Sequence, residues 1–198
     1  MKNYPTILIV EDEMITATSI AELLTQEDYT IIGAARDAAR ALLLCSQAKI
    51  TPAVVICDIN ILGPINGIEL VIQLKELYNC EIVFLTAYAD NKTLLKAFTI
   101  EPVMYVVKPY NDVQLLVAVQ MAFHKVFSKQ KLLINKLILT DRELEIAHLI
   151  ASGMSSKLIC RKLNIGYETV KTHRKRMLSK NNISNFPQLI YLLTNNNS

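Results

Sequence analysis

The chain has 198 residues, of which 52% are hydrophobic and 20% are charged, and its formal net charge is +3. This proportion of apolar residues is enough for packed cores and excludes an intrinsically disordered chain. No apolar run reaches the roughly 18 residues of a membrane-spanning helix, and acidic residues directly follow Val10, so we expect neither a membrane span nor a signal peptide.

The charge is unevenly distributed along the chain. Residues 1–128 contain 9 Lys and Arg against 14 Asp and Glu, whereas residues 129–198 contain 12 against 4. An acidic first part and a basic second part indicate a regulatory or enzymatic domain joined to one that meets a polyanion. The 4 cysteines are widely spaced and form no C-x-x-C pair, so we interpret them as reduced packing residues of a cytoplasmic protein.

Short apolar segments alternate with longer helical patterns through the first part. We expect strands at 6–10, 30–34, 53–57, 81–85 and 103–107, and helices at 14–27, 36–48, 67–78, 91–98 and 112–127. Repeats of a strand followed by a helix predict an α/β fold, a doubly wound five-stranded parallel sheet covered on both faces. With the strand order 2-1-3-4-5, the first and third strands are neighbours.

Charged residues follow three of the predicted strands. Glu11 and Asp12 follow the first, Asp58 ends the third, and Lys108 follows the fifth. The C-terminal ends of parallel strands line one crevice, so these side chains are expected to meet. Carboxylate oxygens suit Mg²⁺, which binds through one or two carboxylates together with phosphate and water. The residues predict a Mg²⁺ and phosphoryl site in which Asp58 is the nucleophile.

Two further side chains are placed to contact the same phosphoryl group. Lys108 supplies a point positive charge, and Thr86 ends the fourth strand, where its hydroxyl can donate to phosphoryl oxygens. Each feature has an ordinary alternative when taken alone, because an acid pair such as Glu11-Asp12 also favours a helix N-terminus. Their combination on successive strand ends favours the functional interpretation.

From Thr140 onward the strand patterns disappear, and helices are expected at 141–152, 156–163, 167–180 and 186–194. One face of the third helix carries a basic stripe of Lys171, Thr172, Lys175 and Arg176, and the other carries Val170, His173 and Met177. Two short helices, a tight turn and this stripe predict a helix-turn-helix that enters the DNA major groove. The alternative is a solvated basic helix on a four-helix bundle.

The first part resembles a known family. The motifs ILIVEDE (7–13), VICDINI (55–61), NGIEL (66–70), FLTAY (84–88) and YVVKP (105–109) are together similar to those of a response-regulator receiver domain, the flavodoxin-like phosphoacceptor module of bacterial two-component signalling. The resemblance implies that a sensor histidine kinase phosphorylates Asp58. It also implies Mg²⁺ binding by Glu11, Asp12, Asp58 and the backbone carbonyl of Asn60.

The same resemblance implies roles for the remaining motif residues. Thr86 and Lys108 would contact the phosphoryl group, and Tyr105 would be the aromatic switch. Asn60 and Tyr88 occupy the positions that tune dephosphorylation in this family. In the dephosphorylated state we expect the acidic receiver to cover the basic helix.

Residues 139–180, with the motifs LTDRE and TVKTH, resemble the LuxR-type helix-turn-helix of NarL/FixJ response regulators. This resemblance implies that double-stranded DNA is a partner and that the last helix supports a homodimer. It also assigns the DNA contacts, with Lys171, Thr172 and Lys175 at bases and Arg174 and Arg176 among the basic residues at phosphates. An apolar residue is usual at Asn181, so the end of the recognition helix is expected to pack less well.

The sequence therefore predicts a receiver domain at 1–128, a linker at 129–138 and an all-α helix-turn-helix domain at 139–198. We expect a transcription regulator whose DNA binding is controlled by phosphate on Asp58, and not an enzyme. One alternative is a metal-dependent aspartyl phosphotransferase or phosphatase, although Asn60 stands where such enzymes usually carry a second acid. Another is a DNA-binding or adaptor protein that acts without phosphate.

Overall fold

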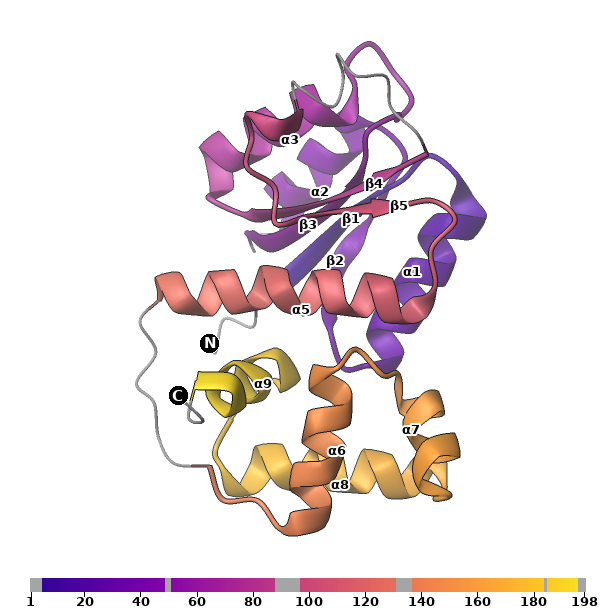
Figure 1. The fold of residues 1–198 in the computed structure, drawn as a ribbon. Coiled ribbons are helices and arrows are strands. Elements are labelled where there is room, and N and C mark those ends of the chain that lie inside the picture. Colours follow the sequence, from indigo (N-terminus) through magenta and orange to yellow (C-terminus); the bar gives the residue numbers. More distant parts are fainter. Residues whose placement is uncertain (1–4, 49–50, 88–96, 131–136, 184, 196–198) are drawn as a thin grey trace.

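The computed structural model describes residues 5–48, 51–87, 97–130, 137–183 and 185–195. A mixed part built around a β-sheet lies against a smaller part made of helices (Figure 1). None of the helices in these ranges is both long and apolar enough to cross a bilayer.

The sheet has five parallel strands in the order β2-β1-β3-β4-β5. Their bounds are β1 Thr6–Val10, β2 Thr30–Ala35, β3 Pro52–Asp58, β4 Glu81–Thr86 and β5 Met104–Val107. This topology confirms the predicted doubly wound sheet. Because β1 and β3 are adjacent, the residues that follow them share one edge of the sheet.

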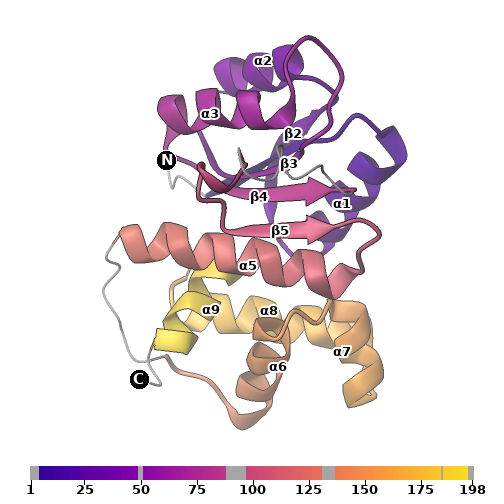
Figure 2. The same cartoon turned by 45° about the horizontal axis from the view of Figure 1, so that its top comes forward.

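Helices cover both faces of the sheet (Figures 1 and 2). On one side lie α1 (Met14–Gln26) and α5 (Asp112–Lys129), and on the other lie α2 (Ala38–Ala48) and α3 (Gly67–Tyr78). Ile7 and Ile9 of β1 belong to the core beneath α1 and α5, whereas Leu8 and Val10 belong to the opposite core. Alternate strand residues therefore fill two separate apolar layers.

One predicted helix start differs from the structure for a local reason, and one predicted helix lies mostly outside the described residues. Helix α2 begins at Ala38 and not at residue 36, because the Asp37 side chain accepts a hydrogen bond from the Arg40 backbone N–H at 2.7 Å and so caps the helix. The predicted helix at 91–98 lies mostly outside the described residues. Only its last two positions are described, and both are helical.

The helical part consists, within the described residues, of α6 (Asp141–Ala151), α7 (Ser156–Leu163), α8 (Tyr167–Lys180) and α9 (Phe186–Asn195). Thr140 and Glu143 form a capping box at the start of α6. Buried residues of all four helices, among them Ile146, Ile159 and Met177, form one core. The predicted short helices are therefore present and packed around a common apolar centre.

The two parts are in direct contact. Helix α9 lies along α5, where the Tyr191 ring is 5.0 Å from the His124 ring and 5.8 Å from the Phe127 ring, measured between centroids. The turn between α1 and β2 reaches α7 and α8 through Glu27, which bonds to Ser156 and Arg174. These contacts hold the helical part against the α1 and α5 side of the sheet (Figure 2).

Candidate functional site

An acidic cluster lies at the C-terminal ends of β1 and β3. Carboxylate oxygens of Glu11, Asp12 and Asp58 all lie within 4.8 Å of one another. Val10 pairs with Cys57, so the residues that follow them in the two strands are neighbours. Glu11 and Asp58 are buried, whereas Asp12 is exposed. The structure therefore brings together the three acids that the sequence places on neighbouring strand ends.

Lys108 joins this cluster from the end of β5. Its Nζ donates to Glu11 Oε2 at 2.7 Å and to Asp58 Oδ2 at 2.5 Å. The Lys108 backbone N–H donates to the Thr86 carbonyl at 2.8 Å, which ties the lysine to the end of β4. Charge-assisted bonds of this kind are stronger than neutral ones. The Lys108 ammonium group thus bridges two carboxylates, which follow or end different strands.

Burial and neighbouring charges shift the pKa values of two groups in the cluster, Glu11 and Lys108. Burial raises the pKa of Glu11 above its ordinary 4.5, and the charge of Asp58 adds to the rise, although the bond from Lys108 opposes it. Burial alone would lower the pKa of Lys108, but its bonds to Asp58 and Glu11 outweigh burial and raise that pKa to about 12. Three carboxylates against one lysine are therefore only partly balanced.

The donor set fits a hard divalent cation. It consists of carboxylate oxygens, two of them buried and one exposed to solvent, which matches the preference of Mg²⁺ for a few carboxylates plus water. A divalent cation would reduce the mutual repulsion of these carboxylates. Glu11, Asp12 and Asp58 are thus able to hold Mg²⁺.

The backbone around Asp58 orients its carboxylate. The Asn60 backbone N–H donates to Asp58 Oδ1 at 2.9 Å, so Oδ1 is held by the backbone while Oδ2 contacts Lys108. Gly67, at the start of α3, lies so close that a Cβ there would overlap the Asp58 carbonyl oxygen. The glycine of the NGIEL motif therefore permits the close approach of α3 to the end of β3.

Thr86 and Tyr105 lie near the cluster without polar partners. Thr86 is 4% exposed, and its Oγ1 has no hydrogen-bond partner among the described residues. The same holds for the Tyr105 hydroxyl, whose ring lies 5.7 Å from that of Phe84. Tyr88 lies outside the described residues. Buried hydroxyls without partners are uncommon, which marks both side chains as able to acquire a new partner.

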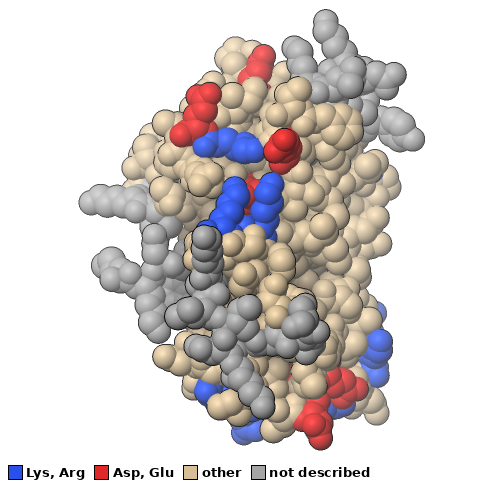
Figure 3. All heavy atoms as spheres, turned by 60° about the vertical axis from the view of Figure 1, so that its left-hand side comes forward, with Lys and Arg blue, Asp and Glu red and all other residues tan. Residues whose placement is uncertain are grey.

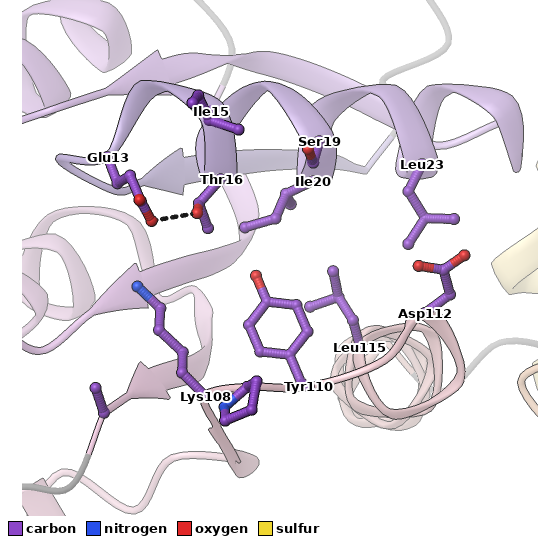
Figure 4. A pocket seen from close by; sticks show the side chains of 12 residues that line it. Glu13, Ile15, Thr16, Ser19, Ile20, Leu23, Lys108, Tyr110, Asp112 and Leu115 are labelled. Carbon is purple, nitrogen blue, oxygen red and sulfur yellow. Dashed lines mark hydrogen bonds between the residues drawn. The ribbon is translucent and has the colours of Figure 1, made fainter.

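A hollow of about 560 Å³ opens beside Lys108, between α1 and α5 (Figure 4). Glu13, Thr16 and Ile20 line it from α1 and its N-cap, and Tyr110 and Leu115 line it from the other side. Burial raises the pKa of Tyr110 to about 12, so its hydroxyl stays protonated at neutral pH. Lys108 thus lines a partly apolar hollow, whereas Glu11 and Asp12 line a separate hollow beside α1 and α2.

The basic stripe of α8 is exposed. Lys171, Thr172, Lys175 and Arg176 are solvent-accessible, and Val170 and Met177 are fully buried on the opposite side, as the periodicity predicts. The sheet part leaves this stripe exposed but contacts the flank of α8 at Arg174, so the expectation that the receiver covers the basic helix is only partly confirmed. The stripe is free to meet a polyanion.

Arg174 differs from the other predicted DNA contacts. It is 2% exposed, and its guanidinium bonds to Glu27 and Asp28 of the sheet part. It is therefore unavailable to DNA in this arrangement, because one flank of α8 faces the turn between α1 and β2. Leu189, Ile190, Leu192 and Leu193 of α9 are likewise buried, so the helix expected to support a dimer is covered.

Elsewhere the surface carries mixed charges. On the side of the molecule seen in Figure 3, basic and acidic side chains alternate among the described residues. Between β4 and α5, Glu81 pairs with Lys125 at 3.1 Å and with Lys129 at 2.5 Å. The described residues on this face therefore form no broad basic patch.

Two family models match the chain. Residues 7–120 match the response regulator receiver domain, and residues 137–193 match the bacterial regulatory proteins of the luxR family. The chain belongs to the response regulator family. Its receiver domain is the sheet part described above, and its LuxR-type DNA-binding domain is the helical part. A receiver domain joined to a LuxR-type DNA-binding domain is the arrangement of a transcription regulator and not of a classical enzyme.

Relatives match over nearly the full length of this response regulator. It is 30% identical to the transcriptional regulatory protein TdiR of Thauera aromatica, over 99% of this chain and 88% of TdiR. It is 28% identical to the oxygen regulatory protein NreC of Staphylococcus haemolyticus, over 93% and 94% of the two chains. It is 29% identical to the transcriptional regulatory protein LiaR of Bacillus subtilis, over 92% and 93%.

Solved structures resemble the receiver. The signal receiver domain of a modulated diguanylate cyclase from Desulfovibrio desulfuricans has a TM-score of 0.59 and 27% identity, over 64% of this chain and 98% of that one. The chemotaxis protein CheY4 of Vibrio cholerae has a TM-score of 0.53 and 23% identity, over 60% and 98%, which shows the shared fold.

Several residues that join the two domains carry no recognisable signal in the sequence. Glu27, Ser156 and Gln120 carry no motif, yet each makes a bond across the interface. These partners are separated by 129 and 30 residues along the chain. Periodicity describes neighbours within one helix or strand and cannot pair such distant positions.

Proposed function

We propose that Asp58 accepts a phosphoryl group from a sensor histidine kinase and that this modification controls DNA binding. The observation that supports it most is the placement of Lys108, whose Nζ contacts both Asp58 and Glu11 while Asp12 lies alongside. An acidic cluster with one bridging lysine suits the transfer of an anionic group to a carboxylate. The hollow beside Lys108 would receive the kinase.

In the transfer, a carboxylate oxygen of Asp58 attacks the phosphorus of a phosphohistidine. A P–O bond forms as the P–N bond breaks, and the electron pair of that bond leaves with the imidazole nitrogen. When bound by Glu11, Asp12, Asp58 and the Asn60 carbonyl, Mg²⁺ would balance the charge of the carboxylates and of the phosphoryl group. The Asn60 backbone N–H keeps the Asp58 carboxylate oriented during the attack.

The new charge on Asp58 is roughly −1.5 to −2 at neutral pH, by analogy with other phosphorylated residues. Lys108 would turn from the two carboxylates toward the phosphoryl oxygens. Thr86, whose hydroxyl has no partner among the described residues, would donate to the same oxygens, and Tyr105 would follow into the space it leaves. Asn60 and Tyr88 would set the lifetime of the acyl phosphate. These movements would bias the chain toward a second, DNA-binding arrangement.

The exposed stripe of α8 supports the output of this switch. Lys171, Thr172 and Lys175 would reach base edges in the major groove, and Arg176 would hold a phosphate. A homodimer formed through α9 would place two such helices on one DNA site. In this arrangement α9 is covered by α5, so dimerisation would require the domains to separate.

The test is footprinting on a genomic library with the wild type and with Asp58→Asn, each with and without acetyl phosphate and Mg²⁺. The expected result is a strong footprint only for the wild type treated with both reagents. Equal footprints in all four samples would contradict control by phosphate while leaving DNA binding intact. Loss of DNA binding in every sample would instead favour an adaptor.

A further inference from the structure

Glu27 of the receiver is bound at the start of helix α7. Its Oε1 accepts the Ser156 backbone N–H at 2.7 Å, and its Oε2 accepts the Ser156 hydroxyl at 2.9 Å. Ser156 is the first residue of α7, where backbone N–H groups lack helical partners and the helix dipole favours an anion. The receiver thus places a carboxylate where the DNA-binding domain attracts negative charge.

Arg174 of α8 completes this binding site. One of its terminal nitrogens donates to Glu27 Oε2 at 2.7 Å and lies 3.3 Å from the Ser156 hydroxyl oxygen. The guanidinium stacks over the Phe186 ring at 4.3 Å and also bonds to Asp28 at 2.9 Å. Ser156 and Arg174 are 3% and 2% exposed. The DNA-binding domain therefore carries a built anion site with a backbone amide, a hydroxyl and a guanidinium.

The position of this site relates it to DNA. Arg174 is three residues after Lys171 and next to Lys175, both of which are exposed on the stripe. In a helix-turn-helix complex the second helix lies in the major groove while the first crosses the sugar-phosphate backbone. Helix N-termini and arginines are common phosphate contacts. The site thus lies where the flank of α8 meets the start of the first helix of the motif.

We propose that this site, formed by Ser156 and Arg174, binds a phosphate of the DNA backbone when the domains separate, and that Glu27 occupies it in the closed form. The inference rests on the proposed DNA-binding role of α8. A carboxylate and a phosphate both present anionic oxygens to the same donors, so the site holds one or the other. Glu27 is then a competitor of DNA, although the stripe itself stays exposed.

The test measures the affinity of the full chain for double-stranded DNA of mixed sequence over a range of salt concentrations, without phosphorylation. Glu27→Gln removes the competing charge, and we expect binding roughly tenfold tighter than that of the wild type. Adding Arg174→Gln should then weaken binding roughly tenfold and reduce the slope of log affinity against log salt by about 1. The control adds Arg40→Gln, an exposed arginine of the receiver that lies outside the helix-turn-helix, and should keep the slope of the Glu27→Gln chain.

Two outcomes would overturn the proposal. If adding Arg174→Gln left affinity and salt slope unchanged, the site would only fasten the domains together. If Glu27→Gln bound DNA no better than the wild type, Glu27 would not compete. In place of Arg174→Gln, Arg174→Lys keeps the positive charge and should restore the slope of log affinity against log salt. Thermal unfolding of each variant checks that it is folded. These measurements use unphosphorylated chains with Asp58 intact. Their result is therefore independent of the footprinting experiment, which tests control by phosphate.

Discussion

Lys108 holds two carboxylates that would otherwise repel each other. Its Nζ lies 2.7 Å from Glu11 and 2.5 Å from Asp58, and its side chain is 20% exposed. Removing one member of a buried charged pair leaves the others uncompensated, which costs more than the pair itself contributes. The lysine is therefore expected to stabilise the receiver as well as to take part in phosphoryl transfer.

Lys108→Gln should lower the free energy of unfolding by about 2 kcal/mol in the absence of Mg²⁺, less than for a fully buried pair because the site reaches solvent. Added Mg²⁺ should restore more stability in this variant than in the wild type, since the cation replaces the missing charge. Urea unfolding with and without Mg²⁺ measures both effects. Lys162→Gln, an exposed lysine of α7, is the control and should change little. An unchanged midpoint for Lys108→Gln would contradict the electrostatic account.

Glu11 gives the receiver a distinct pH dependence. Its pKa in the folded protein is raised above 4.5. Between pH 4.5 and that raised pKa, the Glu11 carboxyl is largely protonated in the folded state and largely ionised in the unfolded chain. The free energy of unfolding therefore falls as pH rises from 4.5 to the raised pKa, because the folded state binds more protons over that range. Without Mg²⁺, the wild type should lose stability relative to Glu11→Gln as pH rises. Urea unfolding at several pH values checks this, and a difference that grows in favour of the wild type would contradict it.

Single residues also show where sequence reasoning succeeds. The meeting of Asp12, Asp58 and Lys108 follows from one rule, that C-terminal ends of parallel strands share an edge. The burial of Arg174 follows from no such rule, since its partners Glu27 and Asp28 come from a turn of the other domain. Helical periodicity assigns Arg174 to a flank of α8 but cannot say what covers that flank.

The helices and strands follow local signals closely. Capping boxes at Asn66, Asn111 and Thr140 mark the starts of α3, α5 and α6. Asn181, expected to weaken the end of α8, instead ties it to the segment before α6. Its side chain accepts from the Ile138 N–H at 2.7 Å and donates to the Ile138 carbonyl at 3.0 Å. A polar residue here replaces apolar packing with hydrogen bonds, which sequence pattern alone does not reveal.

Helix α3 closely approaches the end of β3 at Gly67. Gly67→Ala should lower the free energy of unfolding by about 2–3 kcal/mol and weaken Mg²⁺ binding, because the new methyl group would displace the Asp58 backbone. Gly33→Ala is the matched control. Its Cβ would lie 3.2 Å from the flexible end of Leu44, so the cost should stay below about 1 kcal/mol. Calorimetric titration with Mg²⁺ and urea unfolding compare the two. Equal effects would show that close approach at Gly67 is unimportant.

The whole molecule adopts a closed arrangement that joins its two domains through several kinds of contact. Gln120 of α5 donates to the Ile150 carbonyl at 2.6 Å, α9 packs on α5, and Glu27 binds Ser156 and Arg174. The overall charge asymmetry predicts attraction between the domains but not its form. The acidic receiver meets one arginine on the flank of α8 and leaves the basic stripe exposed, because long-range packing decides which surfaces meet.

The phosphorylation of Asp58 is the event on which this signalling account depends. Its most direct measurement is the intact mass of the full chain after incubation with acetyl phosphate, with and without Mg²⁺. The account predicts that the wild type gains one phosphoryl group only when Mg²⁺ is present, and that Asp58→Asn gains none. A phosphoryl group on Asp58→Asn in equal amount, or no modification of the wild type in the presence of Mg²⁺, would contradict it.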